Sequence, residues 1–222
     1  MLGWAAMKAP SLFCVWFAAS GFAVASCKDD TLPAPKAGSG SATGSNGIVD
    51  DMDREQARYD QERRPDLIVA AAGIKPGNTV ADVGAGSGLL TLHLARAVGN
   101  GKVVATDIDR AVLDLLLARL KKAAVPDVVE TRIVSADTPG LEDGRYDVVL
   151  LAEVDHYFTD RVAWLTAVQK ALAPGGRLVL SNRVHHRVGA MDAAKKAGLV
   201  LKSETTPVPS HFVAVFTVGK AP

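Results

Sequence analysis

The stretch from Val80 to Asp109 reads VADVGAGSGLLTLHLARAVGNGKVVATDID. It begins with an apolar run that ends in a glycine-rich turn, Gly84-Ala85-Gly86-Ser87-Gly88, and a leucine-rich segment with helical spacing follows. A second apolar run, Val103-Val104-Ala105, continues to Asp107. This order predicts a strand, a turn, a helix and a second, parallel strand, the unit from which α/β sheets are built.

The residues at the turn and at the end of the second strand suggest what binds there. Glycines let the backbone turn sharply and approach a ligand closely, and we expect free N–H groups of the new helix to face that ligand. Asp107, at the tip of the second strand, is placed to accept hydrogen bonds from ribose hydroxyls. The unit therefore predicts a nucleoside-bearing ligand.

The glycine spacing separates two kinds of nucleoside. A dinucleotide fingerprint has glycines at its first, third and sixth positions, but Leu89 occupies the sixth position here. The glycines fall at the first, third and fifth positions, and the pattern Asp82-x-Gly84-x-Gly86-x-Gly88 resembles motif I of the class I S-adenosylmethionine (SAM)-dependent methyltransferases. The resemblance implies that this loop, with Ala85, wraps the aminoacyl end of SAM and that Asp82 helps to hold its amino group. A dinucleotide fold and a purely structural glycine turn remain the alternatives.

The rest of the chain extends the same architecture. Apolar runs predict strands at 79–83, 102–106, 128–134, 146–151, 177–180, 199–204 and 211–218. Helices are expected between most of the strands, and a charged helical segment, perhaps broken at Pro65, precedes them. The last two strands are joined by a short connection and should be antiparallel. We therefore predict a Rossmann-like α/β fold, with a mixed sheet of about seven strands, mostly parallel, and helices on both faces.

The N-terminal region differs from the rest in composition. Residues 1–26 contain one charge, Lys8, before an apolar run, as in a secretory signal or an uncleaved membrane anchor. Val24-Ala25-Ser26-Cys27 resembles a bacterial lipobox, which implies a lipidated Cys27 and a protein tethered in the cell envelope. Residues 27–47 read as a flexible linker, and we predict one folded domain at 48–222.

The composition restricts the partners. The net charge of this 222-residue chain is +1, and no basic stripe suggests RNA or DNA binding. No large insertion between strands is present to form an arm or a lid. The absence of such an insertion favours a small-molecule or lipid-like acceptor. No metal site is predicted, because the acidic residue pattern of metal-dependent members is not evident.

The resemblance to the methyltransferase family assigns further residues to the cofactor. Asp107 matches the acid that binds the ribose, and Ile108 matches the residue that packs against adenine. Asp137 matches the acid that accepts a hydrogen bond from the adenine amino group, with Ala136 beside it. Asp137 alternatively caps the turn before Thr138.

The tip of the fourth predicted strand supplies the catalytic candidates. Methyl transfer from a sulfonium depends mainly on alignment, but an oxygen or nitrogen acceptor must also lose a proton to a base. Glu153 could contact the polar end of the cofactor, His156 is the leading candidate base, and Asp155 could act as a base or orient a histidine. The alternative is that Asp155 caps a turn and that His156 is a surface residue.

Two further groups of residues could contribute to the site. In the family, a helix before the first strand often covers the cofactor cleft, so Tyr59 and Arg63 or Arg64 could touch the ligand. Asn182, His185 and His186 follow the fifth predicted strand on the same sheet edge and could line an acceptor pocket.

The sequence thus predicts a membrane-tethered, SAM-dependent methyltransferase. Three rivals remain: a non-catalytic nucleoside-binding module of the envelope, an NAD(P)-dependent oxidoreductase and an aminopropyl transferase. An exported domain would work away from the cytoplasmic source of SAM. Either SAM reaches the envelope, the domain faces inward on an uncleaved anchor, or the fold has lost catalysis.

Overall fold

The computed structural model describes residues 45–125 and 127–219. The predicted signal segment, its lipobox and most of the predicted linker lie outside these residues. Within them, none of the helices is long and apolar enough to cross a membrane.

Seven strands form a single sheet in the order β3-β2-β1-β4-β5-β7-β6. The strands are β1 (Thr79–Val83), β2 (Lys102–Asp107), β3 (Val129–Ile133), β4 (Tyr146–Ala152), β5 (Leu172–Arg183), β6 (Leu199–Val208) and β7 (His211–Val218). Strands β1 to β5 pair in parallel, and β7 pairs antiparallel to both β5 and β6. The predicted mixed sheet and its antiparallel C-terminal pair are confirmed.

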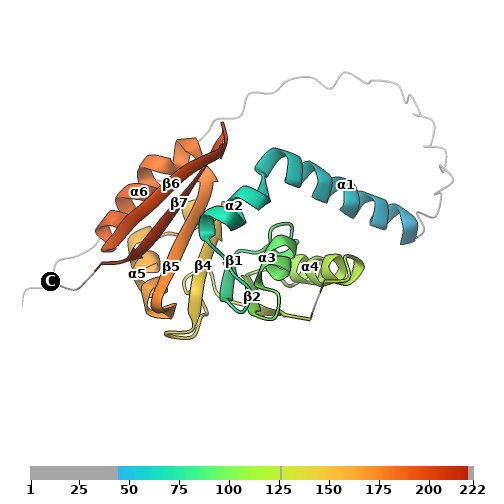
Figure 1. Cartoon of the computed structure of the whole chain (residues 1–222), viewed down its shortest axis with the longest axis horizontal. Helices are drawn as coiled ribbons and strands as arrows, with labels where there is room; N and C mark the ends of the chain where they lie inside the picture. Colours follow the sequence, from blue (N-terminus) through green and yellow to red (C-terminus); the bar gives the residue numbers. More distant parts are fainter. Residues whose placement is uncertain (1–44, 126, 220–222) are drawn as a thin grey trace, which may run out of the picture. The chain divides into compact units, whose positions relative to one another are not determined.

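Helices cover both faces of this sheet (Figure 1). They are α1 (Ser45–Arg63), α2 (Pro65–Ala72), α3 (Thr91–Val98), α4 (Arg110–Lys122), α5 (Arg161–Ala171) and α6 (Arg187–Lys196), with two 3-10 turns, η1 (Asp155–Tyr157) and η2 (Val184–His186). Ile68 of α2 and Leu94 of α3 pack with Val148 on one face, and α4 packs beside α3. On the other face, Leu165 of α5 packs with Val149, in a cluster that also contains α6. The alternation of Val148 and Val149 reflects a central strand that is buried on both faces.

Two strands are longer than the sequence indicates. Ala173-Pro174-Gly175-Gly176 was expected to separate α5 from the fifth strand, but it lies inside β5, where the pairing with β4 shifts register. Similarly, β6 continues through Pro207, because β6 is an edge strand and the register against β7 shifts there. Proline lacks a backbone donor, and such edge or bulge positions tolerate it.

The carboxyl ends of β1, β2 and β4 meet at the point where the chain order in the sheet reverses. From β1 the chain moves outward to β2 and β3 and then returns to β4 on the other side of β1. Ligands of open α/β sheets bind in the crevice at such a switch point. The glycine loop, Asp107 and Glu153 follow these three strands, so the fold brings the predicted cofactor residues to one edge.

Candidate active site

A cavity of about 290 Å³ lies beside the glycine loop at this edge, and we call it the glycine-loop cavity. Five of the residues proposed from the sequence to contact a cofactor, Gly84, Asp107, Ile108, Ala136 and Glu153, line it. The side chain of Ile108 is largely exposed there, which leaves an apolar surface open to a flat ring. The other predicted cofactor residues, Asp82, Ala85, Gly86, Gly88 and Asp137, do not line this cavity.

Asp107 organises the mouth of the glycine loop. Its Oδ2 atom accepts a hydrogen bond from the Gly86 N–H at 2.9 Å, and its Oδ1 atom accepts one from the Asp109 N–H at 3.1 Å. Gly84 has a φ of +67°, and a Cβ atom there would lie 2.7 Å from the Val154 side chain. Glycine is therefore required at this position both for its backbone conformation and for close packing.

The loop N–H groups are less available than the sequence suggests. Thr106 O accepts hydrogen bonds from the N–H groups of Gly84 at 2.8 Å and Ala85 at 3.0 Å. The Gly88 N–H donates to Ala85 O, and the Gly86 N–H is bound to Asp107. These four N–H groups of the loop are therefore bonded within the protein, to β2 and to the turn itself.

Asp82 lies beneath this loop and is only 2% exposed. The Thr91 hydroxyl donates to its Oδ2 atom at 2.6 Å. Burial raises the pKa of Asp82 to about 6, although the Thr91 hydrogen bond opposes this effect. The carboxyl of Asp82 is thus poised to change charge near neutral pH.

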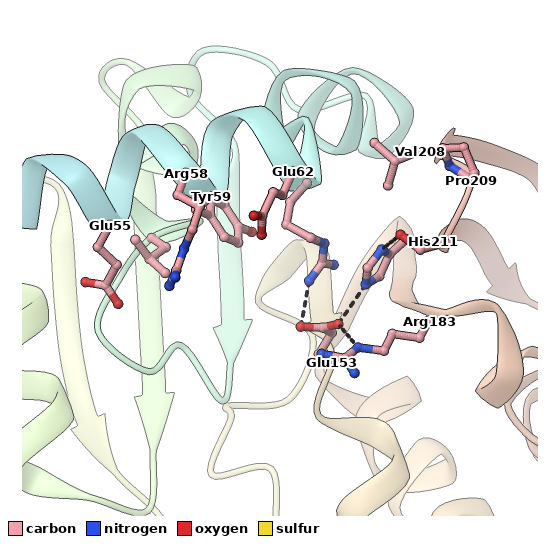
Figure 2. Close-up of a pocket in the computed structure, with 12 residues that line it drawn as sticks. Glu55, Arg58, Tyr59, Glu62, Glu153, Arg183, Val208, Pro209 and His211 are labelled. Carbon is pink, nitrogen blue, oxygen red and sulfur yellow. Dashed lines mark hydrogen bonds and ion pairs between the residues drawn. The ribbon is translucent and has the colours of Figure 1, made fainter.

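A second cavity, of about 550 Å³, lies between α1, the tip of β4 and the start of β7, and we call it the Arg63 cavity. Glu153 lines both cavities, so they meet at this side chain. The Oε2 atom of Glu153 lies 2.6 Å from Arg63 Nη1, and its Oε1 atom lies 2.8 Å from His211 Nε2 and 3.2 Å from Arg183 Nε. Figure 2 shows His211 and Arg183 converging on this carboxylate.

The charges around Glu153 determine its protonation. Burial alone would raise the pKa of Glu153, but the charges of Arg63 and His211 and the hydrogen bond from His211 outweigh it and lower the pKa. Burial lowers the pKa of His211, although the hydrogen bond to Glu153 opposes this effect. At neutral pH, Glu153 is therefore charged and His211 is neutral.

The structure places the predicted catalytic pair elsewhere. Asp155 is fully buried, where its Oδ1 atom accepts a hydrogen bond from Asn182 Nδ2 at 2.6 Å and its carbonyl oxygen accepts one from Arg161 Nε at 2.9 Å. His156 stacks on His186, with 4.1 Å between the ring centroids. Neither Asp155 nor His156 lines either cavity. This geometry gives Asp155 a structural role in holding η1 against β5.

His211 is the functional candidate that sequence reasoning missed. It was assigned only to the start of the last strand, without a role. Because β7 runs antiparallel to β5, His211 pairs with Arg183 at the carboxyl end of β5. The predicted antiparallel pair of terminal strands was only a partial signal, because it did not say which strand of the sheet the last strand would join.

The candidates proposed before the first strand, Tyr59, Arg63 and Arg64, do not all lie at the site. Tyr59 and Arg63 line the Arg63 cavity, whereas Arg64 turns away to form an ion pair with Asp66. In the ranges described, no three His, Cys, Asp or Glu side chains are grouped so as to hold a metal ion.

Comparisons with known proteins bear on the domain family and on the fold. Residues 81–178 match the model of a protein family described as "Methyltransferase domain". Over 115 residues the chain is 31% identical to the ubiquinone/menaquinone biosynthesis C-methyltransferase UbiE of Escherichia coli O1:K1, an alignment that covers 51% of this chain and 46% of UbiE. The chain thus spans about half the length of the curated relatives it matches.

Solved structures share the fold. A SAM-dependent methyltransferase from Aquifex aeolicus superposes with a TM-score of 0.67 at 19% identity, covering 75% of this chain and 96% of that one. The [4+2]-cyclase SpnF superposes with a TM-score of 0.62 at 11% identity, covering 72% and 82%. Together, the comparisons support the enzyme class and the SAM cofactor predicted from the sequence.

Proposed function

We propose that this chain transfers a methyl group from SAM, bound at the glycine-loop cavity, to a small molecule bound in the Arg63 cavity. The observation that carries the proposal is the meeting of the two cavities at Glu153. Methyl transfer is an in-line displacement: the acceptor's electron pair forms a bond to the methyl carbon while the carbon–sulfur bond breaks and its electrons stay on sulfur. Two adjoining cavities hold the two reactants in that alignment.

The adenosine part of SAM fits the glycine-loop cavity. Asp107 is oriented to accept hydrogen bonds from the ribose, Ile108 offers its exposed face to adenine, and Ala136 lines the same wall. Asp82, below the loop, supplies the negative charge for the amino group of SAM. The role proposed for Asp137, acceptance from the adenine amino group, requires its exposed side chain to turn toward the cavity.

His211 is our candidate for removing a proton from the acceptor. Its hydrogen bonds favour a tautomer in which Nε2–H donates to Glu153, while Nδ1 accepts from the Ser210 hydroxyl at 2.8 Å. A proton that leaves the acceptor then reaches Nδ1 through that hydroxyl, and Glu153 stabilises the resulting imidazolium. Asp155 and His156 have no such access from either cavity.

The rival readings differ in measurable ways. A dinucleotide-binding enzyme needs loop N–H groups for its pyrophosphate, and four of those groups here are already bonded within the protein. The fold by itself does not determine the reaction, since SpnF shares it and is a [4+2]-cyclase. Turnover therefore has to be tested separately from binding.

The first experiment is a calorimetric titration of the full-length chain with SAM, its demethylated product and NADH. We expect saturable binding of the first two compounds alone, and we expect Asp107→Ala to weaken it at least about tenfold, because charged hydrogen bonds are lost. Asp114→Ala, an exposed position on α4, serves as the control. Binding of NADH alone would overturn the proposal.

Turnover is tested with isotopically labelled SAM and a bacterial small-molecule extract as the source of acceptors. We expect the label to move into a product, and we expect His211→Gln to reduce the rate while leaving SAM affinity unchanged. Binding without label transfer, with indifference to His211→Gln, would support the non-catalytic nucleoside-binding module instead.

We further propose that the domain is held in the cell envelope by a lipidated Cys27. The support is the sequence Val24-Ala25-Ser26-Cys27, which resembles a lipobox, and the polar linker that follows it. Mass spectrometry of the mature chain should detect acyl groups that are lost in Cys27→Ser. Acyl groups that persist in this variant would rule out the lipobox.

A further inference from the structure

Arg63 has hydrogen-bonding capacity that the protein does not use. Its side chain is only 10% exposed, and Nη1 is bound to Glu153 at 2.6 Å. Its Nε and Nη2 atoms are buried and have no hydrogen-bond partner among the described residues. Leaving charged donors buried and unsatisfied costs free energy, and such groups usually have a function.

The two free atoms lie on the same edge of the guanidinium group. Nε and Nη2 of an arginine present parallel N–H bonds, which match the two oxygens of one carboxylate. Nη1, which holds Glu153, lies on the other side of the group. This edge of Arg63 is available to a second carboxylate once movement of the side chain or of α1 uncovers the two atoms beside the cavity that Arg63 lines.

The charge of the Arg63 cavity favours such an anion. Its lining contains three arginines, Arg58, Arg63 and Arg183, and three glutamates, Glu55, Glu62 and Glu153. Glu55 is already paired with Arg119, which lies outside this cavity. The charged side chains of the lining alone are balanced, and one positive charge is in excess only when Arg119, the partner of Glu55, is counted with them.

The rest of the lining is partly apolar, with Ser210 and His211 as its polar members. Leu89, Val208 and the ring of Tyr59 line the same cavity, and Arg58 and Tyr59 project from α1 toward it (Figure 2). Burial raises the pKa of Tyr59, so its hydroxyl stays neutral. A cavity of about 550 Å³ with these walls suits a small molecule that combines an apolar body with one acidic group.

We propose that the methyl acceptor carries a carboxylate, which binds to Nε and Nη2 of Arg63. This inference rests on the proposed function only in calling the bound molecule the methyl acceptor. Binding of a carboxylate to Arg63 can be measured without methyl transfer. The cofactor has a carboxylate too, on its methionine part. The experiment must therefore distinguish these two sources of the same chemistry.

The test is a calorimetric titration of the full-length chain with benzoate and, as its neutral isostere, benzamide, each in the presence of SAM's demethylated product. We expect benzoate to bind at least about tenfold more tightly than benzamide, which is the size of effect expected for a charge-assisted pair. Arg63→Gln should abolish the preference. Arg63→Lys, which keeps the charge but not the fork, should lose most of it.

Arg54→Gln is the matched control, since Arg54 lies on the same helix with a 74% exposed side chain and does not line the cavity. We expect it to bind benzoate as the wild type does. Equal binding of benzoate and benzamide, or no binding of either at millimolar concentration, would overturn the proposal. It would also be overturned if Arg63→Lys weakened SAM binding and left the preference for benzoate intact, because the cofactor would then supply the carboxylate. Failure of SAM itself to bind the wild type would instead refute the proposed function.

Discussion

Glu153 is the residue at which the site is assembled. Its φ is +56°, a left-handed conformation that side chains other than glycine rarely adopt. Such a conformation costs of the order of 1 kcal/mol or more and persists where the surroundings impose it. Arg63, His211 and Arg183, from three different elements, bind its carboxylate and supply that constraint.

The first prediction concerns the coupling between Glu153 and His211. Glu153→Gln keeps the shape of the side chain but removes the charge that favours protonated His211, so the pKa of His211 should fall further below its ordinary value. NMR titration of the imidazole measures this shift, and Glu62→Gln, on the same cavity, is the control. An unchanged pKa of His211 in Glu153→Gln would mean that the charge of Glu153 does not control the protonation of His211.

Because burial lowers the pKa of His211, the unfolded chain binds more protons than the folded chain near its ordinary pKa. The contribution of His211 to stability is therefore fully present above that ordinary pKa and is lost as the pH falls through the folded value. Glu153→Gln should move this loss to still lower pH. Urea unfolding across the acidic range measures the change.

The second prediction concerns Asp82, whose pKa is raised to about 6. If its charge holds the amino group of SAM, affinity should increase as the pH rises through about 6, and Asp82→Asn should bind SAM weakly and without this dependence. Folding has the opposite sign, because a raised pKa stabilises the fold at low pH and the contribution is lost as the pH rises through about 6. Calorimetric titration and urea unfolding between about pH 5 and about pH 7 measure both. If SAM affinity and stability changed with pH in Asp82→Asn as they do in the wild type, Asp82 would not be the group whose titration causes these changes.

At the scale of elements, Arg119 connects three parts of the site. It lies on α4, is 3% exposed and donates from Nε to Ser87 O of the glycine loop at 2.9 Å. Nη1 donates to Met52 O of α1 at 3.1 Å, and Nη2 forms an ion pair with Glu55 at 2.5 Å. One buried side chain thus joins the loop beside the cofactor cavity to the helix that lines the Arg63 cavity.

The third prediction follows from this connection. Arg119→Met should lower the free energy of unfolding by about 3 kcal/mol, because the carbonyl and carboxylate partners lose a buried donor. It should also weaken SAM binding through the loop. Urea unfolding and calorimetry measure the two effects, with Arg110→Met, exposed on the same helix, as the control. If SAM affinity stayed unchanged while stability fell, Arg119 would be a purely structural residue.

The elements that the sequence predicted best are those whose signals are local. The glycine loop follows from residue type and spacing alone, and aspartates of the preferred N-cap type, Asp109 and Asp160, begin α4 and α5. The extensions of β5 and β6 could not be predicted, because proline is acceptable there only once bulges and sheet edges are known. The role of His211 depended on which strand β7 would pair with. Asp155 could not be recognised as buried until its contact with Asn182 was known.

At the scale of the whole molecule, two kinds of interaction hold the described domain together. The sheet and helices α2 to α6 are joined by continuous apolar clusters on both faces. In contrast, α1 is attached by three ion pairs, Glu55 to Arg119, Asp53 to Lys122 and Arg63 to Glu153, and by hydrogen bonds such as that from Arg119 to Met52 O. Tyr59 is its partly buried hydrophobic contact with the core.

The last prediction is that salt loosens α1 selectively. At roughly 1 M salt the screening length falls to about 3 Å, which weakens partly exposed ion pairs but leaves apolar packing intact or stronger. Amide hydrogen exchange in residues 51–63 should therefore accelerate with salt, while exchange in β4 and α5 should not. Asp53→Asn should reduce the salt effect, since it removes the ion pair with Lys122.

This outcome decides how the acceptor enters. If α1 loosens, the wall that carries Tyr59 and Arg63 can move away from Glu153, and a carboxylate can reach the covered Nε and Nη2 atoms of Arg63. Exchange in α1 that is independent of salt would mean that Tyr59 and the hydrogen bonds of Met52 and Gln56, not the ion pairs, hold the helix. The acceptor would then have to enter past the exposed turn at Pro209 and Ser210, on the other side of the cavity.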